Sequence, residues 1–185
     1  MTMRNYIFIR HAHAEAGEAD QLRCLSQTGK QEAQNMGKIL KGKVFDLVIT
    51  SSAVRTKETA KEILKQLNQT PHIAEIDEIY QPQAKEDREL IEKSLEIFKS
   101  QPLNAYLDHQ LQCAWGKYAK CAFEAMLLEI ELRNSTSVLV VGHGNIINAI
   151  GLHLAPKAKE LSEKFFKNCE GFEIISSQLV RFFPC

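Results

Sequence analysis

The sequence predicts a three-layer α/β/α sandwich with a mostly parallel central sheet. Short apolar runs of strand type alternate with stretches of helical spacing along most of the 185 residues. The run Ser137–Val141 is almost continuously apolar, as expected of a parallel strand that is covered on both faces. Strands that alternate with helices imply crossover connections, and these connections place helices on both faces of one sheet.

The first half of the chain supplies three strands and two helices. Tyr6–Ile9 is an apolar run and predicts the first strand. Ser26–Lys41 repeats apolar residues every three or four positions, which predicts a helix with Ser26 or Thr28 as its cap and Gly42 as its stop. The other elements of this half are predicted by the same patterns: a strand at Phe45–Ile49, a helix at Val54–Leu67 and a short strand at His72–Ile76.

The second half begins with a polar, irregular segment at about 80–112, which has helical patches around Arg88–Lys99 and a breaker at Pro102. We expect it to form an insertion or lid over the ligand crevice of a single domain, 1–185. An apolar stripe from Trp115 to Ile130 predicts the longest helix. The central strand Ser137–Val141, a helix at Asn145–Leu154 and edge strands at Phe172–Ile175 and Leu179–Phe183 complete the chain.

The composition of the chain indicates which kinds of binding partner and which cell compartment to expect. Lys and Arg number 23, as do Asp and Glu, so the formal net charge is +0 and nothing global points to nucleic acid or to a membrane surface. No apolar stretch approaches the ~18 residues of a membrane helix. The five cysteines are scattered and form no C-x-x-C pair. We therefore expect a cytoplasmic protein with reduced thiols and no disulfide frame or zinc site.

Polar residues follow several predicted strands at the edge where such a sheet binds ligands, beyond the carboxyl ends of its strands. Arg10 and His11 follow the first strand, Arg55 lies just beyond the second, and His143 follows the central one, with Gly144 beside it. An arginine fork matches the oxygens of a phosphoryl group, and an imidazole can attack its phosphorus atom. The helix that starts near Asn145 would point its positive end at the same anion.

The motif Arg10-His11-Ala12 resembles the Arg-His-Gly signature of the histidine phosphatase superfamily, which includes the phosphoglycerate-mutase-like proteins. Three later segments are similar to other motifs of that family and fall in the same order: Leu25–Gly29, Ser51–Ala60 and Val141–Asn145. The small size of the chain and its Arg-His-Ala-x-Ala start most resemble the phosphohistidine-phosphatase branch. The polar insertion is longer than is usual in that branch, and Ala12 stands where the family has glycine.

The resemblance implies a metal-independent phosphatase without a cofactor. His11 would attack the phosphorus atom and become a phosphohistidine, while Arg10, Arg55, His143 and Gly144 would bind the phosphoryl oxygens. The substrate would be a small phosphorylated metabolite or a phosphohistidine protein. Two alternatives share the fold: a phosphotransferase like phosphoglycerate mutase, and a non-catalytic protein that binds a phosphorylated ligand. The sequence does not give the oligomeric state.

Two further positions are predicted at the site. In larger family members a glutamate after the third strand protonates the leaving group, and Glu78 occupies the corresponding place. The alternatives for this proton donor are Asp77, Glu86 and Asp87. If the first strand continues beyond residue 11, His13 faces the same side as His11 and lies at the rim of the pocket.

The pair His11 and His13 also permits a different interpretation. A His-x-His pair after a strand begins many zinc-dependent hydrolase barrels. That barrel needs about 250 residues and further ligands, and Arg10 beside a dication would be repelled. We therefore disfavour a metal site.

Overall fold

The computed structural model describes residues 3–17, 19–106 and 111–184, and a six-stranded sheet forms its centre. The strand order is β3-β2-β4-β1-β5-β6. Four neighbouring strands, β3, β2, β4 and β1, run parallel, and β5 and β6 add an antiparallel hairpin. The strands are β1 (Asn5–Arg10), β2 (Leu47–Thr50), β3 (His72–Glu75), β4 (Ser137–Gly142), β5 (Gly171–Ile175) and β6 (Gln178–Phe183). The predicted fold class is confirmed.

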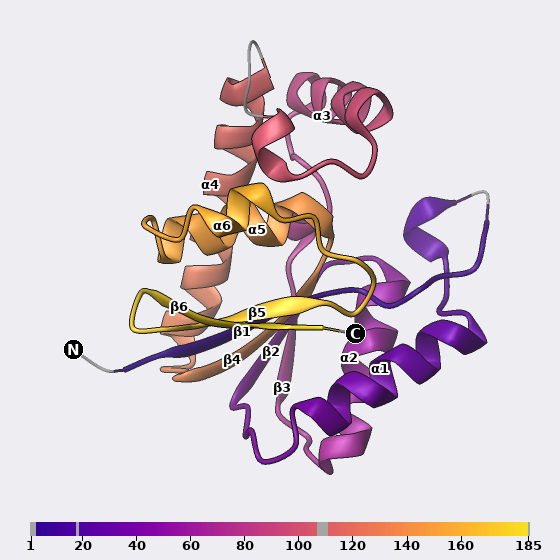
Figure 1. Cartoon of the computed structure of the whole chain (residues 1–185), viewed down its shortest axis with the longest axis vertical. Helices are drawn as coiled ribbons and strands as arrows, with labels where there is room; N and C mark the ends of the chain where they lie inside the picture. Colours follow the sequence, from indigo (N-terminus) through magenta and orange to yellow (C-terminus); the bar gives the residue numbers. More distant parts are fainter. Residues whose placement is uncertain (1–2, 18, 107–110, 185) are drawn as a thin grey trace.

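Helices cover both faces of the sheet (Figure 1). On one face, α1 (Gln27–Ile39) packs against α2 (Val54–Leu67). The other face carries α4 (Leu111–Leu132), α5 (Gly144–Leu154) and the short α6 (Glu160–Glu163), while α3 (Lys85–Phe98) packs on α4 farther from the sheet. Within the described part of the chain, no helix is long and apolar enough to cross a membrane.

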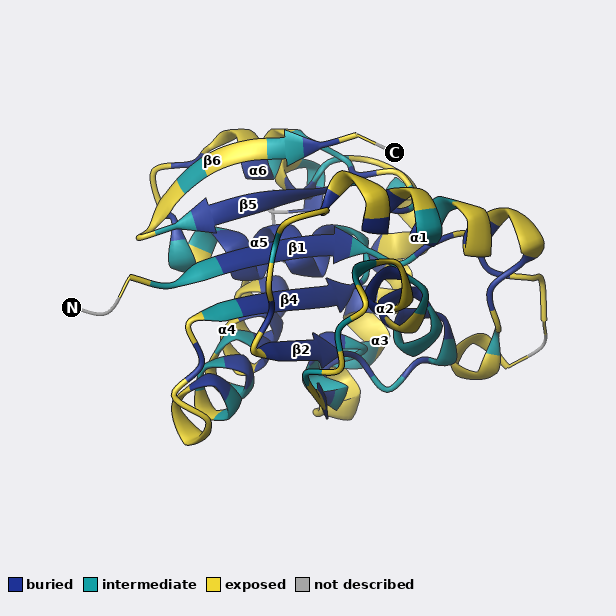
Figure 2. Cartoon of the chain, turned by 90° about the horizontal axis from the view of Figure 1, so that it is seen from below, coloured by how far each residue is buried: buried dark blue, intermediate teal, exposed yellow. Residues whose placement is uncertain are grey.

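The central strands are buried on both faces, which explains their nearly continuous apolar sequence. Along β1, Ile7 and Ile9 join the apolar cluster beneath α1 and α2, whereas Tyr6 and Phe8 join the cluster beneath α4 and α5. Figure 2 shows the same contrast across the sheet: β1, β4 and β2 are buried, and β6 at one edge is largely exposed. Apolar clusters on both faces of the sheet therefore fix the positions of the central parallel strands.

One expectation from the sequence is wrong, and another is right only in part. Strand β5 is not an edge strand, because it pairs with β1 on one side and β6 on the other; the edges are β3 and β6. The segment at about 80–112 is less irregular than expected: α3 confirms the helical patches predicted around Arg88–Lys99, and the turn η3 (Leu103–Tyr106) follows, while 107–110 lie outside the described residues. Although the segment is mostly polar, α3 has a buried side, on which Ile91 and Ser94 lie.

The start of α1 holds the segment that follows β1. The Ser26 hydroxyl accepts a hydrogen bond of 3.0 Å from the backbone N–H of Gly29, which confirms Ser26 as the cap. A side chain at Gly29 would place its Cβ 2.0 Å from the carbonyl oxygen of His13, so this close contact requires glycine. The chain from His11 to His13 therefore lies directly against the first turn of α1.

Candidate active site

The carboxyl ends of β1 and β4 meet at one point of the sheet and bring the two predicted histidines together. In the parallel register Arg10 lies opposite Gly142, so the next residues, His11 and His143, are neighbours. The His11 backbone N–H donates to the Gly142 carbonyl at 2.9 Å. The centroids of the two imidazole rings are 5.1 Å apart.

Arg55 joins the two histidines from the first turn of α2. It is 5% exposed. Its Nε lies 3.3 Å from His11 Nε2, and one terminal nitrogen lies 3.4 Å from His143 Nδ1. Because the guanidinium contacts both rings, its positive charge lies beside His11, where a bound anion would have to sit.

Arg10 and the start of α5 complete the cationic end. The Arg10 guanidinium donates to the Phe166 carbonyl at 2.6 Å and lies 4.9 Å from the centre of the Phe165 ring. Helix α5 begins at Gly144, directly after His143, so its positive N-terminal end faces the same space. The structure thus brings together Arg10, His11, Arg55, His143 and Gly144 from three separate segments of the chain.

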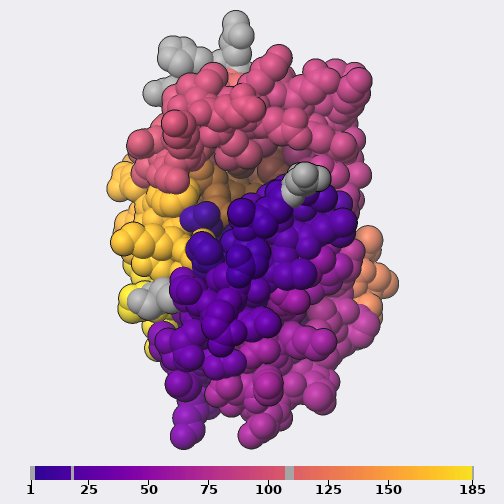
Figure 3. Space-filling view, turned by 90° about the vertical axis from the view of Figure 1, so that its right-hand side faces the viewer, coloured from indigo at the N-terminus to yellow at the C-terminus, as the bar shows by residue number. Residues whose placement is uncertain are grey.

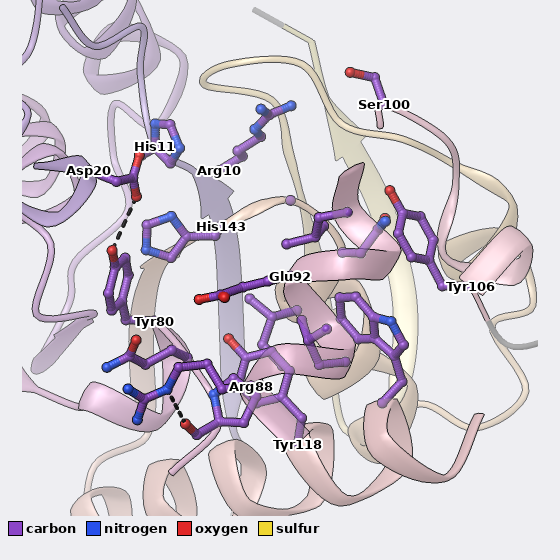
Figure 4. A pocket seen from close by; sticks show the side chains of 18 of the residues that line it. Arg10, His11, Asp20, Tyr80, Arg88, Glu92, Ser100, Tyr106, Tyr118 and His143 are labelled. Atoms are coloured by element: carbon purple, nitrogen blue, oxygen red, sulfur yellow. Dashed lines mark hydrogen bonds between the residues drawn. The ribbon is translucent and has the colours of Figure 1, made fainter. Parts of the chain in front are cut away.

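These residues line one end of a cavity of about 560 Å³. Figure 3 shows the hollow on the surface, between the N-terminal segment and the region that contains α3. Figure 4 shows Arg10, His11 and His143 at one end and Tyr106 at the other, with Glu92 of α3 pointing in between. The position of the hollow beyond the carboxyl ends of the parallel strands agrees with the general rule for such sheets.

The lone pair of His11 lies on Nε2, where it accepts a hydrogen bond from Arg55 Nε. Its Nδ1 lies 2.8 Å from the Ala12 carbonyl oxygen, and because a carbonyl can only accept, Nδ1 carries the proton. Burial, together with the charges of Arg55 and Arg10, lowers the pKa of His11 to about 3 and outweighs the opposing hydrogen bond to Ala12. The imidazole is therefore neutral at physiological pH, with Nε2 unprotonated, as a nucleophile requires.

His143 is oriented by a chain of hydroxyl groups. Its Nε2 lies 2.7 Å from Ser51 Oγ, which lies 3.0 Å from Thr56 Oγ1, and Thr56 Oγ1 donates to the Ala53 carbonyl at 2.8 Å. Because Arg55 donates to Nδ1, the proton of a neutral His143 belongs on Nε2. Burial and the adjacent His11, Arg55 and Arg10 lower the pKa of His143 well below its ordinary value.

Asp20 and Tyr80 are site residues that sequence reasoning missed. The Asp20 carboxylate accepts from Arg55 at 2.8 Å, from Arg23 at 2.9 Å and from the Tyr80 hydroxyl at 3.2 Å. Burial alone would raise the pKa of Asp20, but the charge of Arg55 and these hydrogen bonds lower it. Asp20 lies on the turn η1 (Asp20–Leu22). The sequence holds one signal for Asp20: it lies three residues before Arg23, a spacing that allows an ion pair, in the segment between His11 and α1.

Glu78 lies on the turn η2 (Asp77–Ile79), is partly exposed, and does not belong to the set of residues that line the cavity. Asp77 accepts hydrogen bonds from Ser52 and Gln83. Within the described residues, the carboxylates that line the cavity are Asp20 and Glu92. The assignment of Glu78 as proton donor stays a prediction, as do the alternatives.

His13 is placed differently from the sequence expectation. Strand β1 ends at Arg10, so the alternation that would bring His13 to the side of His11 does not continue. The exposed His13 ring instead lies with its Nδ1 2.7 Å from Ser26 Oγ, and His13 is not among the residues that line the cavity. Across the described ranges, no group of three His, Cys, Asp or Glu side chains has an arrangement that could hold a metal ion.

The lowered pKa of His11 predicts that acid destabilises the fold. In the unfolded chain the pKa is ordinary, near 6.5, so the unfolded state binds the proton more readily than the folded state. Above that pH the imidazole is neutral in both states and has no effect, whereas stability falls as the pH drops from about 6.5 towards 3. From His11 alone we expect the free energy of unfolding to be about 2 kcal/mol lower at about pH 5 than at neutral pH.

Urea unfolding of the wild type and of His11→Gln at about pH 7.5 and about pH 5 measures this effect. The variant should lose about 2 kcal/mol less on acidification, because glutamine does not titrate. An identical pH dependence in both proteins would show that His11 is not held neutral by the fold.

A family model links this site to known proteins. The model for the histidine phosphatase superfamily (branch 1) matches residues 6–174, which include both histidines and both arginines. The chain belongs to the histidine phosphatase superfamily. No curated protein matches it.

Solved structures of histidine phosphatase folds are similar to the whole chain. The protein histidine phosphatase SixA complexed with tungstate is 18% identical with a TM-score of 0.64, covering 96% of this chain and 95% of the other. Phosphoglycerate mutase from Bacillus anthracis is 18% identical with a TM-score of 0.65, covering 94% and 88%. Mycobacterial glucosyl-3-phosphoglycerate phosphatase is 12% identical with a TM-score of 0.61, covering 98% and 96%. At these identities the likeness concerns the fold.

Proposed function

We propose that this histidine phosphatase family member is a metal-independent phosphatase that hydrolyses phosphoric monoesters or phosphohistidine through a covalent phosphohistidine on His11. The observation that carries the proposal is the neutral His11 ring, whose unprotonated Nε2 lies 3.3 Å from the buried Arg55. The tungstate complex of SixA supports it, because tungstate, like phosphate, is a tetrahedral oxyanion.

In the first step, His11 Nε2 donates its lone pair to the phosphorus atom. The new P–N bond forms as the P–O or P–N bond to the leaving group breaks and the leaving group takes the electron pair. Arg10, Arg55 and the first N–H groups of α5 stabilise the charge on the phosphoryl oxygens, and His143 contributes when the bound anion favours its protonated form, whose Nδ1–H can donate. The hydrogen bond from His11 Nδ1 to Ala12 orients the ring and shares the positive charge that develops on it.

In the second step, a water molecule attacks the phosphorus atom of the phosphohistidine. The P–N bond breaks, its electron pair returns to Nε2, and inorganic phosphate leaves. The two steps divide one difficult displacement into two easier ones. The water loses one proton and the leaving group gains one, so the overall reaction is hydrolysis.

The leaving group of an alkyl ester needs a proton donor, for which Glu78 is the residue that the family pattern suggests. Glu92 has the advantage that it lines the cavity, whereas Asp20 also lines it but is the weaker candidate because its lowered pKa keeps it ionised. A leaving group that is itself stable, such as the imidazole of phosphohistidine or p-nitrophenolate, needs this acid less. Comparison of Glu78→Gln, Asp20→Asn and Glu92→Gln on an alkyl ester against p-nitrophenyl phosphate assigns the donor.

Rapid-quench turnover of p-nitrophenyl phosphate in the presence of a metal chelator tests the proposed reaction. We expect undiminished release of inorganic phosphate and a phosphoenzyme that is labile in acid and stable in base. Activity that a chelator removes would contradict metal independence. Transfer of the phosphoryl group to an added alcohol in place of water would favour the phosphotransferase, and absence of turnover would favour the non-catalytic alternative.

A further inference from the structure

The cavity continues from the two histidines to the space beneath α3, where its chemistry changes (Figure 4). Ile91 and Leu95 of α3 line this far end together with Tyr106, Trp115 and Tyr118. The first end is cationic and fits a phosphoryl group. The wall beneath α3 carries these aliphatic and aromatic side chains, and polar side chains lie around it: Arg88, Glu92, Lys99, Ser100 and Asn145.

The polar atoms of the aromatic side chains at the far end form hydrogen bonds with other residues of the protein. Trp115 Nε1 donates to Ser94 Oγ at 3.3 Å, and the Tyr118 hydroxyl donates to the Ile79 carbonyl at 3.3 Å. The Tyr106 hydroxyl donates to the Lys99 carbonyl. Because these donors already have partners, the rings offer a ligand apolar contact rather than hydrogen bonds.

Packing fixes these rings in place. The ring centroids of Tyr106 and Trp115 are 5.3 Å apart, and those of Trp115 and Tyr118 are 5.8 Å apart. All three side chains are at most 5% exposed. Leu95 differs, because it lies on the same wall but is 45% exposed and presents its side chain to the hollow. The wall is therefore preformed, with one accessible aliphatic residue.

We propose that the substrate is a small phosphoric monoester whose alcohol carries an apolar, ring-containing body, and that this body packs beneath α3 while the phosphoryl group lies at His11. The inference rests on the proposed function and narrows its substrate class. A cavity of about 560 Å³ is of ordinary size for a small-molecule site. Burial of one phenyl ring against such a wall is expected to strengthen binding at least about tenfold.

Other phosphorylated compounds fit this cavity less well. Against the wall formed by Ile91, Leu95 and the three aromatic rings, the hydroxyl groups of a sugar phosphate would lose water without gaining hydrogen bonds. A phosphohistidine on a folded protein carries no apolar body beyond its imidazole, and the protein surface around it would meet α3 and the N-terminal segment, which border the hollow (Figure 3). The apolar end would stay unfilled in both cases.

Two esters with similar leaving groups test the inference. 2-Phenylethyl phosphate and ethyl phosphate differ in the phenyl ring but little in the basicity of the leaving alkoxide, so the chemical step is matched. We expect kcat/KM to be at least about tenfold higher for the phenylethyl ester. Equal values for the two esters, or faster hydrolysis of a phosphohistidine protein than of either ester, would overturn the proposal.

Two variants on α3 locate the preference. Leu95→Asn places a polar group on the cavity wall and should reduce the ratio between the two esters to about threefold or less. Ile97→Asn is the matched control, because Ile97 lies on the same helix, is 71% exposed and is not part of the cavity lining. A ratio that is unchanged in Leu95→Asn, or reduced equally in both variants, would place the preference elsewhere and contradict the proposal.

Binding of phosphonates separates this inference from the proposed reaction. 3-Phenylpropylphosphonate and propylphosphonate resemble the two esters but cannot be hydrolysed, and calorimetry measures their affinities directly. A preference of about tenfold or more for the phenyl compound without turnover of any ester would support the cavity inference and refute the phosphatase. Turnover without a preference for the phenyl ring, in esters and phosphonates alike, would refute the inference and leave the phosphatase standing.

Discussion

Replacement of His11 by alanine is expected to abolish phosphatase turnover, with kcat reduced by a factor on the order of 10⁴ or more. In the proposed reaction the imidazole supplies the atom that forms the covalent bond, and a methyl group cannot replace it. The other cationic groups remain, so the variant should still bind inorganic phosphate or vanadate. Steady-state turnover of p-nitrophenyl phosphate and rapid quench for the phosphoenzyme measure the loss of catalysis. Calorimetric titration with inorganic phosphate measures the retained binding.

The matched control is His72→Ala, which removes an exposed histidine at the start of β3, the opposite end of the strand from the site. It should keep wild-type rates. If His11→Ala turned over substrate at a rate close to that of His72→Ala, His11 would not be the nucleophile.

Replacement of Arg55 by alanine is expected to lower kcat/KM by about 10² to 10³-fold, the usual effect of removing one preorganised donor from a transition-state site. Arg55 is buried and contacts both His11 and His143. Arg55→Lys keeps the charge but loses the planar fork, so it should recover less than a tenth of the lost activity.

Arg133→Ala is the control for this pair of variants, because Arg133 forms an ion pair with Glu129 on α4 and does not line the cavity. Its kinetics should match the wild type. Full activity in Arg55→Lys would mean that Arg55 contributes only its charge. Full activity in Arg55→Ala would mean that Arg55 does not stabilise the transition state.

The central residues of the candidate site could be predicted because each has a strong local signal. Arg10 and His11 follow an apolar strand, and His143 follows the most apolar run of the chain. In a parallel sheet all such positions lie along one edge, so their convergence follows from topology without knowledge of the exact register. The register Arg10 opposite Gly142 then makes the two histidines direct neighbours.

The residues that could not be predicted lie where local patterns carry little information. Asp20 is one acidic residue in a connecting segment, and its contact with Arg55 depends on how that segment folds over α2. Leu95 becomes part of the cavity through the packing of α3 on α4, which the polar composition of α3 conceals. The position of β5 inside the sheet depends on its pairing with β1, far away in sequence.

The pairing of β1 with β4 also bears on partial unfolding, because the two ends of the cavity depend on different parts of the fold. This ladder lies in the middle of the sheet, between apolar clusters on both faces, so His11 and His143 cannot separate without global, cooperative unfolding. Helix α3 packs mainly on α4, farther from the sheet, and joins that core through Ile91 and Phe98. As the protein is heated, we expect the proposed preference for a ring-containing substrate to weaken at a lower temperature than the proposed reaction at His11.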